Sequence, residues 1–79
     1  MSNLGAIIKQ QRELLGISQN ELATKCDLKN GQFISNIERG ACSASPKVIK
    51  AIAKAMRMRR EVLIEYAVKD AEERYRARF

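Results

Sequence analysis

The sequence lacks histidine and tryptophan altogether, and only two of its 79 residues, Cys26 and Cys42, are cysteines. Two cysteines are too few for a disulfide scaffold, and without histidine they cannot complete a four-ligand zinc site in one chain. The four glycines form no loop of the kind that cradles a phosphate group. We therefore expect no metal, no cofactor, no small-molecule ligand and no enzymatic activity.

Long apolar runs and linker-like segments are also missing. The N-terminal segment carries Lys9 and Arg12 among its apolar residues, so it predicts neither a signal peptide nor a membrane span. A single proline, with 46% hydrophobic and 30% charged residues, is typical of one globular domain around one core. We expect a cytoplasmic protein that does not bind membranes.

Acidic residues are scarce in the first three quarters of the chain. Residues 1–60 contain 11 lysines and arginines against four acidic residues, a net charge of +7. Residues 61–79 contain four basic residues against five acidic ones, a net charge of −1, so the net charge of the whole chain is +6. This charge favours a polyanionic partner, although a soluble protein can also simply be basic.

The first half of the chain predicts two helices followed by a turn. Apolar residues at helical spacing over residues 4–15 predict a first helix, which Gly16 ends. Ser18 with Glu21 three residues later is a capping-box pattern, and it predicts a second helix that runs to about residue 26. Residues 27–31 have the composition of a turn.

Three further helices are predicted after this turn. The third contains Ile34 and Ile37 at helical spacing and ends at Gly40. Ser45 before Pro46 predicts the N-cap and first position of a fourth helix. Residues 61–78 contain neither glycine nor proline and favour a long fifth helix. No useful strand-like alternation occurs, so the sequence predicts an all-α bundle of five helices.

Three strings of residues share fixed offsets with a known family. They are Ser18-Gln19-x-Glu21-Leu22-Ala23, Ile34-Ser35-x-Ile37-Glu38-Arg39-Gly40 and Ile52-Ala53-x-x-Met56. Over about residues 4–63 the sequence resembles the Cro and lambda-repressor type of helix-turn-helix proteins, the XRE family. The resemblance implies a lambda-repressor-like fold with an extended C-terminal helix, in which residues 1–60 form the DNA-binding domain. It also implies a sequence-specific transcriptional regulator of double-stranded DNA, most often a repressor.

The turn before the third helix is one residue longer than is usual in this family. Counting back from Ile34 places Gln32 and Phe33 at the start of the recognition helix, after a turn at residues 29–31. The resemblance assigns base contacts to Asn30, Gln32, Phe33 and Asn36. Amide side chains donate and accept together, so they can pair with N6 and N7 of adenine. Phe33 either touches a thymine methyl group or folds back onto the core.

Other residues around this helix are candidates for phosphate contacts or for structural roles. Free N–H groups at the start of the second helix favour anion binding by Gln19. The candidate phosphate contacts are Ser18, Gln19, Lys29, Arg39, Ser43 and Lys47. Arg12 and Glu38 match family positions that form a structural ion pair. We expect Cys26 to be a small buried residue, and Cys42, in a loop, to be the more reactive thiol.

The fifth helix carries a narrow apolar stripe beyond the main region of resemblance. Its members follow one another at steps of four, three, four and four: Ile64, Val68, Ala71, Tyr75 and Phe79. The start of the stripe can fold back onto the core, which we expect for Ile64 and in part for Val68. Tyr75 and Phe79 lie several turns further on, and we expect them to pack against a second copy, with residues 61–79 as the dimerisation element. A homodimer would bind a near-palindromic operator. The alternative is an antitoxin that binds its operator and uses another surface to hold a toxin protein.

Overall fold

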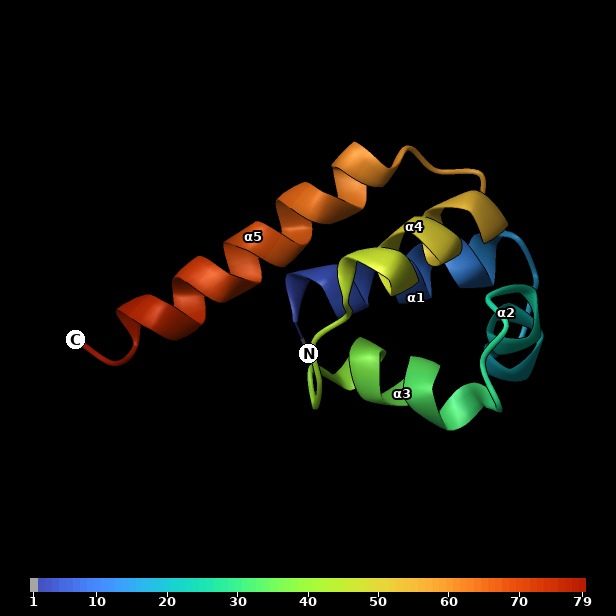
Figure 1. Cartoon of the computed structure of the whole chain (residues 1–79), viewed down its shortest axis with the longest axis horizontal. Coiled ribbons are helices and arrows are strands. Elements are labelled where there is room, and N and C mark those ends of the chain that lie inside the picture. The colour runs from blue at the N-terminus through green and yellow to red at the C-terminus, as the bar shows by residue number, and fades with distance from the viewer. Residues whose placement is uncertain (1) are drawn as a thin grey trace.

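A computed structural model describes residues 2–79, and its backbone forms five α-helices (Figure 1). The helices are α1 (Asn3–Leu14), α2 (Gln19–Lys25), α3 (Gly31–Arg39), α4 (Pro46–Ala55) and α5 (Arg60–Arg76). No strand occurs within residues 2–79. The all-α, five-helix prediction is confirmed.

Short polar side chains begin four of the five helices. In α2, Ser18 Oγ accepts a hydrogen bond from Glu21 N at 3.0 Å, and Glu21 Oε1 accepts one from Ser18 N at 3.0 Å. The bond from the Ser18 backbone is the main reason why the pKa of the Glu21 carboxyl is lowered. Ser45 caps α4 in the same way, with Pro46 at the first helical position. Both predicted starts are therefore confirmed.

Apolar residues from all five helices meet in one core. The largest side chains that are fully buried are Ile8, Leu22, Ile34, Ile37, Ile52, Met56 and Leu63. Because α2 and α3 both bury their apolar faces here, the outer face of α3 is left for solvent. Of the described helices, none is long and apolar enough to cross a membrane.

The fifth helix packs on α1 and α4 through its first half and then leaves the body of the protein (Figure 1). Asp70 marks the point of departure. Its carboxylate is buried and accepts hydrogen bonds from Asn3 N at 2.7 Å and Leu4 N at 3.0 Å. These are free N–H groups of the first turn of α1, so Asp70 fastens α5 to the start of the chain. Every residue after Asp70 is exposed.

Two local predictions are wrong. Ile64 and Val68 do not fold back onto the core, because their side chains are 43% and 52% exposed. The reason is that α5 turns Leu63, Tyr66 and Ala67 toward the core instead. Gly31 belongs to α3 and not to the preceding turn, since Asn30 is the N-cap of that helix. The division into residues 1–60 and 61–79 stays a prediction.

Candidate nucleic-acid interface

The second and third helices form a close pair in which glycine is required at one point. Asn20 Oδ1 of α2 accepts a hydrogen bond from Gly31 N at 2.7 Å. A Cβ atom on Gly31 would lie 2.7 Å from Asn20 Oδ1 and 2.9 Å from Asn20 N. Only glycine therefore allows α3 to begin this close to α2.

The inner face of α3 is anchored by a buried ion pair. Arg12 Nε lies 2.8 Å from Glu38 Oε2, and Arg12 Nη2 donates to Glu38 Oε1 at 3.3 Å. The hydrogen bond to Glu38 is the main cause of the raised pKa of the Arg12 guanidinium. Arg12 Nη1 also donates to Ile17 O at 3.0 Å. The pair thus ties α1, the α1–α2 turn and α3 together.

Gln19 joins the same network from the first turn of α2. Its Nε2 donates to Glu38 Oε1 at 3.1 Å, while the residue remains half-buried. The amide is therefore held in one orientation at the edge of the α3 face.

The outer face of α3 presents the predicted base-contacting residues. Gln32 is exposed, Asn36 is half-buried and Phe33 is 37% exposed, so the ring is not enclosed by the core. Asn30 is also exposed, but its Oδ1 caps α3 by accepting from Gln32 N at 2.9 Å. Asn30 Oδ1 therefore keeps one lone pair for another partner, and within residues 2–79 the Asn30 amide nitrogen forms no side-chain hydrogen bond.

A chain of hydrogen bonds runs along this face. Gln32 Nε2 donates to Asn36 Oδ1 at 3.0 Å, and Arg39 Nη2 donates to the same oxygen at 2.5 Å. The three side chains come from successive turns of α3 and lie on one side of it. They give the face an ordered polar edge, which the residue types alone did not predict.

The predicted phosphate-contacting residues lie before α3, at its end and after it in the sequence. All but Gln19 are exposed: Ser18 caps α2, Lys29 precedes α3, Arg39 ends it, Ser43 lies in the following loop and Lys47 is in the first turn of α4. None of the three cations forms an ion pair with a carboxylate within residues 2–79. They are available to a polyanion.

The two cysteines are unpaired thiols of different exposure. Cys26 is buried, and this burial raises the pKa of its thiol, whereas Cys42 is half-buried. Across the part of the chain that the structure describes, no three side chains of the metal-binding types gather in one place.

Comparisons with known proteins agree with this geometry. Residues 8–63 match the helix-turn-helix family model HTH_3. The chain is also 39% identical over 59 residues to the uncharacterized HTH-type transcriptional regulators MT0491 and Rv0474 of two Mycobacterium tuberculosis strains. These 59 residues are 75% of this chain and 41% of either regulator, so the chain spans about two fifths of their length.

Solved structures give a match over nearly the whole chain. The wild-type restriction-modification controller protein C.Esp1396I is 30% identical with a TM-score of 0.70, over 89% of this chain and 88% of that one. An alanine variant of the same controller protein is 29% identical with a TM-score of 0.71, over 91% and 92%. The chain therefore belongs to the HTH_3, XRE-type helix-turn-helix family.

Proposed function

We propose that this protein is a sequence-specific repressor that binds a near-palindromic operator as a homodimer in the cytoplasm. The observation that carries the proposal is the polar outer face of α3, which is held rigid from behind by the buried pair of Arg12 and Glu38. The major groove of B-form DNA is about 12 Å wide and accepts one such helix. A small dimer over its operator excludes other proteins from that DNA, which is the simplest route to repression.

The two kinds of DNA contact are assigned to different side chains. We propose base contacts for Asn30, Gln32, Phe33 and Asn36, which lie on the outer face of α3 or at its N-cap. We propose phosphate contacts for Ser18, Gln19, Lys29, Arg39, Ser43 and Lys47. Phosphate contacts supply affinity and register, whereas base contacts supply sequence preference.

This division predicts different outcomes for two alanine variants. Asn36→Ala should weaken binding to the preferred site by about 1 to 3 kcal/mol while leaving binding to random duplex nearly unchanged. Gln19→Ala should weaken both by a similar factor, because a phosphate contact is independent of sequence. Fluorescence anisotropy with both duplexes measures the difference. Identical behaviour of the two variants would show that the assignment is wrong.

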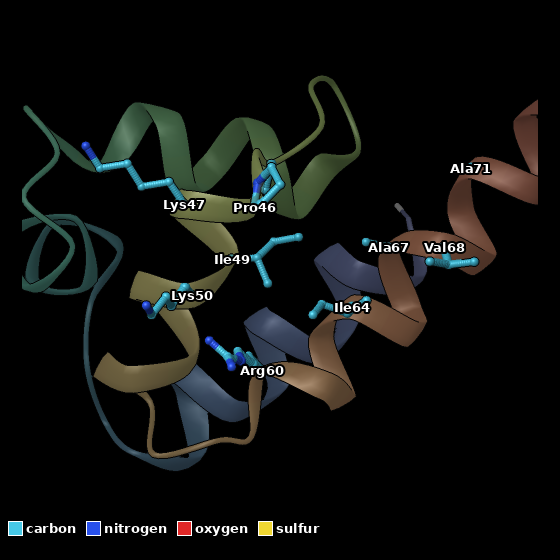
Figure 2. Close-up of a pocket in the computed structure, with 10 residues that line it drawn as sticks. Pro46, Lys47, Ile49, Lys50, Arg60, Ile64, Ala67, Val68 and Ala71 are labelled. Atoms are coloured by element: carbon cyan, nitrogen blue, oxygen red, sulfur yellow. The ribbon is translucent and has the colours of Figure 1, made fainter.

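An apolar groove beside α5 and the exposed apolar stripe on this helix support the homodimer. A groove of about 710 Å³ runs between α4 and α5 and is mostly apolar. Figure 2 shows Ile49 of α4 together with Ile64 and Val68 of α5 along it. From Ala71, which also lines the groove, the stripe continues to Tyr75 and Phe79, whose ring centroids lie 5.3 Å apart.

An exposed apolar surface of this kind is typical of a protein interface. A second copy is the favoured occupant, because the same stripe on both copies is self-complementary about a two-fold axis. In this assignment residues 61–79 are the dimerisation element of the domain, with Ile64, Val68, Ala71, Tyr75 and Phe79 at the contact.

A single charge in the stripe should separate the two copies. Val68→Asp should give a folded monomer, since the side chain is 52% exposed in one copy and its replacement leaves Asp70 in place. Operator affinity should then fall by roughly 10²-fold, because two linked recognition helices bind with avidity. Light scattering and operator titration measure both effects.

The matched control is Gln10→Asp, which makes the same charge change on the exposed side of α1. It should leave the dimer intact. A wild-type protein that is monomeric at micromolar concentration, or a Val68→Asp variant that stays dimeric, would contradict the interface. Recovery of the wild type with a second protein in equal amount would favour the antitoxin alternative instead.

A further inference from the structure

Two side-chain hydrogen bonds end on one atom of the α3 face, Asn36 Oδ1. It accepts a hydrogen bond from Gln32 on one side and another from Arg39 on the other. An amide oxygen has two lone pairs. Both are used within the protein, so the oxygen has no remaining capacity to accept from DNA.

Asn36 and Arg39 have only donors left to offer, whereas Gln32, one turn earlier, keeps its acceptor Oε1. The Asn36 amide nitrogen carries two N–H groups, neither of which forms a side-chain hydrogen bond within residues 2–79. Arg39 has five N–H groups and no acceptor, and it has no carboxylate within ion-pair distance in the described chain. At Asn36 and Arg39, the last two turns of the helix therefore offer only hydrogen-bond donors.

The base edges of the major groove differ in what they can receive from such a surface. Adenine presents one acceptor, N7, and one donor, the N6 amino group, so an amide must both donate and accept to pair with it. Guanine presents two acceptors, N7 and O6. A surface of donors alone is matched to guanine and leaves the adenine amino group without a partner.

We propose that Asn36 and Arg39 act as one unit that selects guanine, and not adenine, at the base pair facing Asn36, while Gln32 occupies the second lone pair of the Asn36 oxygen. This inference rests on the proposed function and specifies its DNA target. Arg39 then has two roles. It donates a hydrogen bond to Asn36 Oδ1, and its other N–H groups donate to the guanine edge. Arg39 is then a specificity-determining residue and not solely a phosphate contact.

Replacing Arg39 should change which base the protein prefers at this position. Arg39→Ala removes one of the two hydrogen bonds to Asn36 Oδ1 and frees one lone pair. The Asn36 amide can then donate and accept together, which is the pattern that adenine requires. The variant should lose the preference for guanine and gain adenine at this position.

Selection from random duplex DNA with the full chain tests the proposal. The relevant position is the one whose preference disappears in Asn36→Ala. Wild type and the control Lys54→Ala, an exposed cation of α4 away from α3, should both enrich guanine there. Arg39→Ala should enrich adenine or lose the preference. Replacing that guanine by 7-deazaguanine should weaken wild-type binding roughly tenfold, because one acceptor is lost.

The outcomes separate this inference from the proposed function. Enrichment of a defined site with adenine opposite Asn36 in the wild type, or full affinity for the 7-deazaguanine site, would overturn the inference alone. An Arg39→Ala variant that keeps the wild-type preference would do the same. Failure of the wild type to enrich any sequence would overturn the proposed function as well.

Discussion

Glu38→Ala is expected to lower the free energy of unfolding by about 3 to 5 kcal/mol, a large part of the stability of a domain this small. Glu38 is only 3% exposed, and its carboxylate accepts hydrogen bonds from both Arg12 and Gln19. Its removal leaves the Arg12 guanidinium, 11% exposed, without a counter-charge. Urea denaturation followed by circular dichroism measures the change.

The control for this variant removes both charges together. The double variant Arg12→Met with Glu38→Leu should recover most of the lost stability, because a buried pair replaced by apolar groups of similar volume is often neutral or stabilising. DNA affinity should not recover, since Gln19 then lacks the acceptor that orients its amide. A loss below about 1 kcal/mol for Glu38→Ala would mean that water reaches the guanidinium and solvates it.

Local patterns in the sequence predict where α2 and α4 begin and where α3 ends, although they do not predict where α3 begins. Ser18 with Glu21 and Ser45 with Pro46 cap helices in the structure as they do in the pattern. Gly40 ends α3 with a φ of +76°, a conformation that glycine adopts without strain. These features depend on residues within four positions of each other, so the sequence alone contains them.

Features that depend on distant residues are not predictable in the same way. Asp70 accepts from the N–H groups of Asn3 and Leu4, 67 and 66 positions away, and nothing around it distinguishes it from a solvated carboxylate. The exposure of Ile64 and Val68 depends on which side of α5 meets α1 and α4. The stripe of Ile64 and Val68 does not decide this, because Leu63 and Tyr66 form a second apolar side of the same helix.

The candidate site shows the same limit at the level of single atoms. The sequence predicts the residue types of the α3 face and the spacing that puts Gln32 and Asn36 on one side of the helix. It does not predict that Asn36 Oδ1 accepts from both Gln32 and Arg39. Base preference depends on which donors and acceptors remain free, so it requires the side-chain arrangement.

Gly5→Ala is expected to destabilise the protein by about 3 kcal/mol or more, although alanine is the better helix former by about 1 kcal/mol. Gly5 lies in the first turn of α1, where the helix crosses the end of α3. An added Cβ would collide with the Glu38 carbonyl oxygen and would lie 2.7 Å from Glu38 C and 2.8 Å from Glu38 Cα. These are backbone atoms that cannot rotate away, so α1 and α3 must separate.

The separation should also reach the DNA-binding face. Because Glu38 is the residue that Gly5 contacts, moving α3 lengthens the distance between its carboxylate and Arg12, and the anchor of the recognition helix is weakened. We expect the Tm to fall by at least ~12 °C and operator affinity to fall with it. Gln10→Ala, on the exposed side of the same helix, controls for propensity and should leave both unchanged or slightly raised. A Gly5→Ala variant as stable as Gln10→Ala would mean that the two helices can move apart at no cost, contrary to the close packing of their backbones.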